Sequence, residues 1–189
     1  MAMPALSRRW TLSEVRALIR DNPRETPRYE LVDGELLVTP SPKFLHQRKG
    51  VKLILALGEY LARCPVGIVM TSPSDVELEE ESLVQPDVYV LSMDEARRLN
   101  AAQTDPTTQL LLVVEVLSPS TARHDRVAKR ALYQRRVPEY WVVDNDARII
   151  ERWTRSSDRP EIVTTTLAWT PEGATAPFEL DVAALFAEL

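Results

Sequence analysis

The chain of 189 residues contains few of the residues on which several large enzyme classes depend. A single cysteine, Cys64, excludes an intramolecular disulfide and a zinc site built from cysteines. The two histidines, His46 and His124, lie far apart in the sequence, which argues against a histidine-rich zinc site. The five glycines form no phosphate-binding Gly-x-x-x-x-Gly-Lys loop, no dinucleotide-binding Gly-x-Gly-x-x-Gly and no Gly-x-Ser-x-Gly nucleophile turn.

Long apolar runs are absent as well. No stretch approaches the roughly 20 apolar residues that a membrane-spanning helix needs, and the first ten residues contain no apolar core of a signal peptide. Hydrophobic residues at 44% and charged residues at 27% are ordinary for a globular domain with one sizeable core. We therefore expect a cytoplasmic protein that does not bind membranes.

The net charge of −5 argues mildly against a general nucleic-acid-binding protein, but the charges are unevenly distributed. Asp75–Glu81 holds five acids and no base, whereas Arg123–Arg136 holds six bases and one acid. A second basic stretch, Lys43–Arg63, holds five bases and one acid. Two basic helices could receive phosphate groups; alternatively, they are solvated faces that pair with the acidic segment.

Local patterns predict the first elements. Thr11-Leu-Ser-Glu14 is a capping box that opens a helix to about Arg20, which we expect to support the fold rather than the site. Asp33-Gly34 is a strong turn signal and predicts a β-hairpin over Arg28–Thr39. A long helix is expected over Lys43–Cys64. Its apolar residues recur at helical spacing and predict a core-facing stripe: Val51, Ile54, Leu55, Leu57 and Leu61.

The remainder alternates between strand and helix patterns. One or two strands are expected within Val66–Leu78, then a strand ending at Leu91 and a helix opened by Ser92. A strand-helix-strand unit follows from Leu110 to Asp144. We expect an antiparallel pair over Arg148–Trp153 and Ile162–Leu167, and a last helix capped by Asp181. The fold class is therefore mixed α/β or α+β, with helices flanking a sheet.

Two acids lie within apolar strand patterns. Glu115 is the only charged residue of Leu110–Leu117, where ionising a carboxylate is costly unless a cation or strong donors compensate. It is a metal ligand or catalytic acid, or else it faces a solvated strand end or pairs with an arginine. Asp87 lies in a second β-type run, Val84–Leu91. Two such strands can place both carboxylates at one sheet edge, where they would suit a hard cation such as Mg²⁺.

The order of these motifs resembles the Uma2 family, which belongs to the restriction-endonuclease-like (PD-(D/E)XK) superfamily. The matching pieces are Tyr29–Leu37, His46, Pro86-Asp-Val88, Val114–Thr121, Asp125-x-x-x-Lys129-x-x-x-Tyr133 and Pro138–Asp144. The resemblance implies a central mixed β-sheet flanked by helices, with an N-terminal β-hairpin. It makes residues 28–189 a single domain after a helical extension, residues 1–27. It also implies hydrolysis of DNA with Mg²⁺ or Mn²⁺.

The resemblance also implies a site. Asp87 and Glu115 are expected to bind the metal, with Glu35 as third acid and Glu30 as its competitor, and His46 is expected nearby. The superfamily pattern has lysine two residues after the second acid, where this chain has Leu117. The catalytic set that we predict is therefore Asp87, Glu115, Glu35 and, from the following helix, Lys129.

Lys129 shares a helix face with Asp125, Tyr133 and Arg136, and Tyr133 is expected near the site. The alternative is a simple Asp125–Lys129 ion pair along the helix. On the adjacent face, Val127 and Leu132 are among the residues expected to pack on the sheet. We expect contacts with DNA phosphates from Arg123, Arg126, Arg130 and Lys49.

Two other functions compete with a nuclease. One is a catalytically silent member of the fold that acts as a binding or regulatory module. The other is a structural homo-oligomer with Trp153 and Trp169 in the subunit interface, and a homodimer is also compatible with the nuclease hypothesis.

Overall fold

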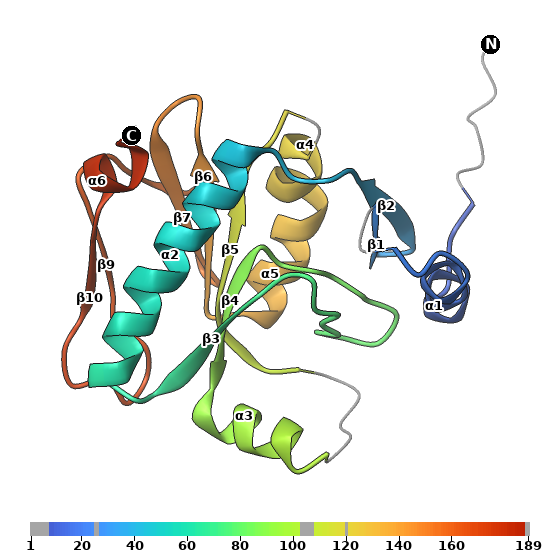
Figure 1. Ribbon diagram of the computed structural model, residues 1–189, viewed down its shortest axis with the longest axis horizontal. Helices are drawn as coiled ribbons and strands as arrows, with labels where there is room; N and C mark the ends of the chain where they lie inside the picture. Colours follow the sequence, from blue (N-terminus) through green and yellow to red (C-terminus); the bar gives the residue numbers. More distant parts are fainter. Residues whose placement is uncertain (1–7, 25–26, 103–107, 120, 188–189) are drawn as a thin grey trace.

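The computed structural model describes residues 8–24, 27–102, 108–119 and 121–187, which form a helix-flanked sheet with an outlying hairpin (Figure 1). Helix α1 (Leu12–Asp21) begins with the predicted capping box at Thr11. Strands β1 (Arg28–Val32) and β2 (Glu35–Thr39) form the predicted hairpin, and Asp33 and Gly34 turn the chain with φ of 50° and 79°. Helix α1 packs on the hairpin through a small apolar cluster: Val15, Leu31 and Leu83.

The central sheet has six strands in the order β3-β4-β5-β6-β7-β8. Their bounds are β3 Gly67–Thr71, β4 Val88–Ser92, β5 Leu110–Val116, β6 Glu139–Asp144, β7 Ile149–Thr154 and β8 Glu161–Val163. Strands β5 and β6 are parallel and every other neighbouring pair is antiparallel, so the sheet is mixed. The predicted fold class is confirmed. The expected second strand of the late pair is divided, however, because its residues belong to β8 and to a separate strand.

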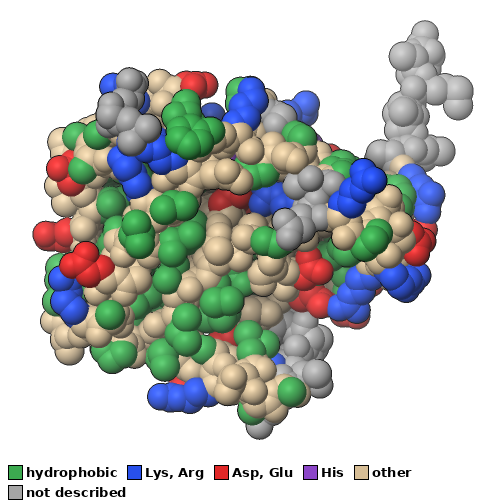
Figure 2. All heavy atoms as spheres, in the orientation of Figure 1, with side chains coloured by type: hydrophobic (Ala, Val, Ile, Leu, Met, Phe, Trp, Pro, Cys, Tyr) green, Lys and Arg blue, Asp and Glu red, His purple; other side chains and the backbone are tan. Residues whose placement is uncertain are grey.

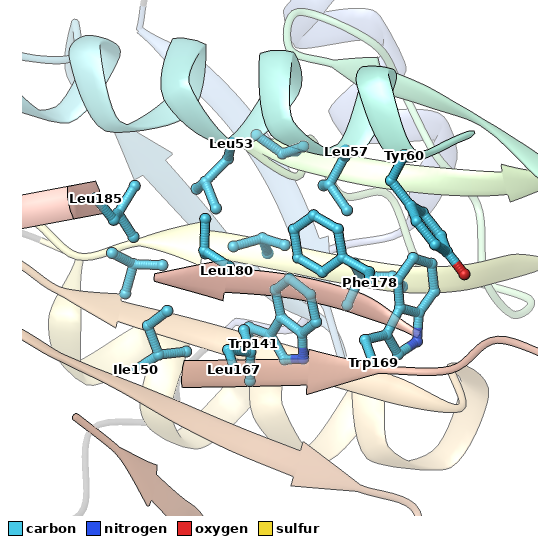
Figure 3. Close-up of a cluster of buried hydrophobic side chains, with 14 of the residues drawn as sticks. Leu53, Leu57, Tyr60, Trp141, Ile150, Leu167, Trp169, Phe178, Leu180 and Leu185 are labelled. Carbon is cyan, nitrogen blue, oxygen red and sulfur yellow. The ribbon is translucent and has the colours of Figure 1, made fainter. Parts of the chain in front are cut away.

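Helices cover both faces of this sheet (Figure 1). Helix α2 (Phe44–Arg63) packs on one face through Leu53 and Leu57, against side chains such as Trp141. The C-terminal pieces complete this side: β9 (Thr166–Trp169), β10 (Phe178–Asp181) and α6 (Val182–Phe186). Figure 3 shows the resulting core, in which Tyr60 of α2 lies among the aromatic rings of the late strands.

The opposite face is covered by a continuous helical segment, made of α4 (Ala122–His124), a π turn (Asp125–Lys129) and α5 (Arg130–Arg136). Leu132 and Tyr133 of this segment pack on Tyr140 and Val142 of β6. The predicted packing of Val127 is wrong, since 58% of this residue is exposed. Helix α3 (Met93–Asn100) lies beside the edge strand β3 and its neighbour β4, and it is capped by Ser92.

The predicted phase of α2 is partly wrong. Leu57 and Leu61 are buried as expected, but 54% of Val51 and 68% of Leu55 are exposed. Residues 51–57 are apolar almost all the way round the helix, so the pattern did not fix which side faces the sheet. Exposed apolar side chains consequently spread over the face that α2 covers (Figure 2). Among the described residues, no helix is both long and apolar enough to cross a membrane.

Candidate active site

The sheet brings Asp87 and Glu115 together, because Asp87 immediately precedes β4 and this strand runs antiparallel to β5. Val88 is paired with Val114, so Asp87 lies at the carboxyl end of β5. The Val116 amide donates to Asp87 Oδ2 at 2.9 Å, and the Asp87 amide faces Glu115 Oε2 at 3.3 Å. The two carboxylates therefore share one sheet edge, as expected from their strand positions.

Glu115 points away from α2 because alternate residues of a strand face opposite sides. Its neighbours Val114 and Val116 pack on the α2 side, whereas the Glu115 carboxylate meets Lys129 and Tyr133 on the other side. Lys129 Nζ lies 3.1 Å from Glu115 Oε1, and the Tyr133 hydroxyl donates to the same oxygen at 2.8 Å. Glu115 is only 2% exposed, so these two donors replace its water contacts.

Lys129 joins three carboxylates. Its ammonium lies 2.9 Å from Glu30 Oε1 and 3.5 Å from Asp125 Oδ1, in addition to its contact with Glu115. The π turn carries both Asp125 and Lys129, and both are buried. Single π turns inside α-helices are rare and are often found at functional sites. The expected Asp125–Lys129 pair thus exists, but as one part of a larger ion cluster.

The acid that reaches this cluster from the hairpin is Glu30. Glu30 is fully buried, pairs with Lys129 and accepts from the Gln85 amide at 2.8 Å. Glu35, the predicted third acid, is exposed beside the turn. The register pairs Glu35 with Val32 and places Glu30 two positions farther along the same face. Both acids therefore satisfy the alternation pattern, but only Glu30 lies toward the open end of the hairpin that meets the sheet.

Asp87 has its own partners, Arg28 and His46. Arg28 NH1 lies 3.1 Å from Asp87 Oδ1, and His46 Nε2 lies 2.9 Å from Asp87 Oδ2. His46 is thus near the acids, as expected, but Arg28 was missed by the sequence analysis. The signal for Arg28 was its position two residues before Glu30, on the same face of β1.

These contacts set the two acids' pKa values apart. Burial opposes the ionisation of Asp87, but the His46 hydrogen bond and charge and the Arg28 charge outweigh it and hold the pKa well below its usual range. Burial raises the pKa of Glu115 well above its ordinary value, against the opposing effect of Lys129, and the charges of Asp87, Asp125 and Glu30 raise it further. The Asp87 carboxyl is therefore held in its ionised form, whereas burial and the surrounding acids oppose the ionisation of Glu115 despite its contact with Lys129.

Lys129 and Tyr133 also have perturbed pKa values. Burial tends to discharge Lys129, but Glu115, Glu30 and Asp125 together raise its pKa well above the ordinary value, so the side chain is an ammonium. Burial, and then the charge of Glu115, raise the pKa of Tyr133. The phenol therefore stays protonated and donates a hydrogen bond to Glu115.

The charge balance of this cluster suits a divalent cation. Four buried carboxylates, Glu30, Asp87, Glu115 and Asp125, face the two permanent cations Arg28 and Lys129. Glu30 Oε2 is buried and has no hydrogen-bond partner, which leaves a carboxylate oxygen available to a ligand. In the described ranges, however, no three His, Cys, Asp or Glu side chains are already arranged around a common metal position.

Two adjoining cavities open at the carboxyl ends of β5 and β6, beside the cluster. Their volumes are about 290 and 250 Å³, and both are lined by Lys43, His46, Ser118 and Pro119. Arg28 lines the first cavity and Arg126 the second. Crevices at this end of the strands are the usual ligand positions in open α/β sheets. Lys43 and Arg28 around the first cavity would attract an anionic ligand toward Asp87, whereas the second cavity is also lined by Asp144 and Asp146.

The predicted phosphate-binding residues have different surroundings. Lys49 is buried and donates to the Leu185 carbonyl at 2.9 Å, so the prediction for this residue is wrong: it supports α6 from within the core. Arg126 pairs with Asp144 and Glu151, each at 2.6 Å. Arg130 donates to the Arg126 carbonyl at 2.9 Å and lies over the Trp153 ring. Arg123 is exposed.

Comparison with known proteins supports the same fold. The Uma2 family model, described as "Putative restriction endonuclease", matches residues 12–183. A crystal structure of a "putative nuclease" from Anabaena variabilis ATCC 29413 superposes with a TM-score of 0.67. The two chains are 15% identical, and the match covers 85% of this chain and 90% of the other. No curated protein resembles the sequence closely enough to count as a relative.

Proposed function

Because the chain belongs to the Uma2 family, whose model is described as "Putative restriction endonuclease", we propose that it is a nuclease that hydrolyses DNA phosphodiester bonds with bound Mg²⁺ or Mn²⁺. The observation that carries this proposal is the buried cluster at one edge of the sheet, where Lys129 pairs with Glu30 and Glu115, and Asp87 lies beside Glu115. Its excess of carboxylates and its unpartnered Glu30 oxygen fit a divalent cation. The cavities lined by Lys43 and His46 give a phosphate access to that edge.

Asp87 and Glu115 are the residues that would hold the metal, with Glu30 beside them. A divalent cation supplies two effects when bound: it polarises a phosphate oxygen and lowers the pKa of an attacking water. Tyr133 and Lys129 both contact Glu115 Oε1, so they fix this carboxylate and leave Oε2 on the side of Asp87. The pair of acids is therefore oriented by the chain itself.

Lys129 supplies the positive charge that a lysine at the position of Leu117 would supply in the superfamily pattern. Its ammonium touches Glu115 directly, which is the contact that a lysine moved from strand to helix must make. Such a fixed cation in a dry site stabilises negative charge that develops on a phosphate. Because its pKa is raised, Lys129 remains charged through neutral pH, so we propose electrostatic stabilisation rather than proton donation as its role.

Asp87 must exchange a partner before it binds a metal. Arg28 contacts one carboxylate oxygen, and His46 together with the Val116 amide contacts the other. Either side chain that is released lies at a cavity wall, since Arg28 and His46 both line the cavity of about 290 Å³. A released cation there would lie where an incoming phosphate enters.

A titration separates this proposal from its closest rival. We expect calorimetry with Mn²⁺ or Mg²⁺ to show one bound ion per chain, and Asp87→Asn or Glu115→Gln to lose it while thermal unfolding shows a folded protein. Duplex DNA cleavage should disappear in both variants. Unchanged metal affinity in both would remove the proposed site.

The rival is a catalytically silent binding or regulatory module, and one observation favours it. Both oxygens of Asp87 already have partners within the chain, so the cluster is compatible with a purely structural ion network. In that case wild-type protein would bind no metal and cleave nothing. The structural homo-oligomer is less well supported, because Trp153 and Trp169 are buried within the chain and cannot form a subunit interface.

Three further properties belong to the same proposal. We propose a cytoplasmic location, consistent with the single buried free cysteine. DNA rather than RNA is the substrate we propose, and a cleavage assay with both tests that choice. A homodimer stays a prediction that sedimentation would check.

A further inference from the structure

A third cavity adjoins the site on the far side of Arg28. It has a volume of about 270 Å³ and lies between the end of α1, the start of β1 and residues 73–75. Its walls include Tyr29, Pro27 and Pro73, with Gln85 and Asp75 as polar lining groups. Nothing in the proposed chemistry uses this pocket, yet Arg28 lines both it and the cavity beside Asp87.

Two side chains of this pocket, Gln85 and Arg28, each have one buried polar atom without a hydrogen-bond partner. Gln85 and Arg28 are each more than nine-tenths buried. Gln85 Nε2 donates to Asp75 at 2.7 Å, but the Gln85 Oε1 acceptor has no partner. Arg28 NH1 contacts Asp87, Gln85 and Ser72, but the Arg28 Nε donor has none. Buried polar groups normally have partners, so an unpaired donor and an unpaired acceptor in one pocket point to a ligand that supplies both.

We propose that this pocket binds one unpaired nucleobase of the substrate, next to the phosphate that is cleaved. Every base carries donors and acceptors along its edge and a flat face for stacking. Arginine donates readily to base acceptors, and glutamine and acidic side chains accept from base amino groups. Tyr29 and the neighbouring prolines offer the flat apolar walls on which single-stranded bases stack.

The charges of the pocket favour a base over a phosphate. The lining of the pocket carries Asp75 as well as Arg24 and Arg28, so its charges largely offset one another, whereas Lys43 and Arg28 line the cavity on the Asp87 side with no acid among its lining residues. Arg28 thus separates a subsite of mixed charge with flat apolar walls from one that attracts anions. The side chain of one arginine is comparable in length to the separation between a base and its own phosphate. This inference rests on the proposed nuclease function and adds that the nucleotide at the cleavage point is unpaired when it is bound.

Binding without metal tests the pocket separately from cleavage. The probes are two short oligonucleotides, one fully abasic and one abasic except for a single 2-aminopurine. We expect the single base to tighten binding by about fivefold or more, from a stacking contribution of about 1–3 kcal/mol per base, and its fluorescence to fall on binding. Tyr29→Leu and Gln85→Met should each lose most of that gain, whereas Gln47→Met, at an exposed position of α2, should keep it.

The outcomes separate the two proposals. Equal binding of both oligonucleotides, with DNA cleavage by the wild type in Mg²⁺, overturns the base pocket alone. Absence of cleavage and of binding overturns both proposals. A gain from the single base that persists in Tyr29→Leu and Gln85→Met would place the base elsewhere and also overturn the pocket.

Discussion

Lys129 is a buried positive charge surrounded by three carboxylates, and this single residue keeps the cluster in balance. Without it, Glu30, Glu115 and Asp125 would face one another with only Arg28 and His46 nearby. Removing one partner of a buried ion pair typically costs about 3–5 kcal/mol, because the remaining charge is uncompensated. The lysine is therefore a structural residue as well as the cation of the proposed chemistry.

We predict that Lys129→Gln lowers the free energy of unfolding by about 3 kcal/mol or more, and that the loss grows with pH. Burial raises the pKa of Glu115, and the charge of Lys129 opposes that rise. The pKa of Glu115 should therefore be higher still in the variant. When the pKa of an acid is higher in the folded state than in the unfolded chain, the protein loses stability as the pH rises above the unfolded pKa, about 4.3 for glutamate. Urea unfolding at about pH 5 and about pH 8 measures the difference.

The matched control for this prediction is Lys43→Gln, at an exposed lysine. We expect a change within about 0.5 kcal/mol at both pH values. A loss in Lys129→Gln that shrinks as pH rises would contradict the charge balance. The measurements stay above the acid range in which Asp87, whose pKa is held low, takes up its proton.

Glu30 and Glu35 provide a second test at the scale of single residues. We predict that Glu30→Gln weakens Mn²⁺ binding by about tenfold to a hundredfold and reduces cleavage, as losing a group beside a metal's ligands commonly does. Glu35→Gln should change neither, because Glu35 is exposed beside the hairpin turn. Calorimetry on the two variants decides the third acid, and the opposite result would restore Glu35.

The helical segment over the site shows at the level of elements what sequence patterns can and cannot predict. The spacing of Asp125, Lys129 and Tyr133 correctly placed them on one face, and the strand patterns placed Asp87 and Glu115 at one edge. The π turn was not predictable, because an extra residue in a helix leaves the local propensities unchanged. It is favoured by the ion contacts that Asp125 and Lys129 make with residues distant in sequence.

The same limit explains the errors elsewhere. Lys49 donates to the Leu185 carbonyl of α6, more than a hundred residues away in the chain. The orientation of α2 depends on which apolar side chains fit the sheet, and here Leu53 and Leu57 do so rather than Val51 and Leu55. A pattern of residue types specifies faces within an element, whereas packing between elements selects among them.

We predict that deleting Val127 disrupts the site, although Val127 itself is exposed. The deletion removes the additional residue that the π turn accommodates, so an α-helical turn would move Asp125 or Lys129 out of the cluster. We expect a loss of about 3 kcal/mol or more in unfolding free energy, together with loss of Mn²⁺ binding. Val127→Ala is the control and should stay within about 0.5 kcal/mol; comparable losses in both variants would contradict the role of the turn.

Across the described part of the molecule, ion pairs occupy several basic side chains, whereas Lys43 and Arg123 lie exposed, where they can contact DNA phosphates. The acidic segment is tied to the rest of the chain: Glu77 pairs with Arg16, and Glu79 pairs with Arg135 at 2.8 Å. Arg126 is paired with Asp144 and Glu151. The alternative that the basic helices pair with the acidic segment therefore applies to Arg135, whereas Arg126 pairs with acids of β6 and β7. Arg123 and Lys43 are exposed, and Lys43 lines both cavities of the site.

We therefore predict that binding to duplex DNA depends on salt through few phosphate contacts. Each phosphate contact contributes a slope of about 0.9 in the logarithm of affinity against the logarithm of salt concentration. Lys43→Gln and Arg123→Gln should each lower the slope by about that amount, measured by fluorescence anisotropy without metal. Arg135 lies on the same helical segment as Arg123 but is paired with Glu79 and Asp33. The Arg135→Gln variant should therefore leave the slope unchanged. A larger effect from Arg135→Gln than from Lys43→Gln would place the DNA on the acidic segment's side, away from Asp87 and Glu115.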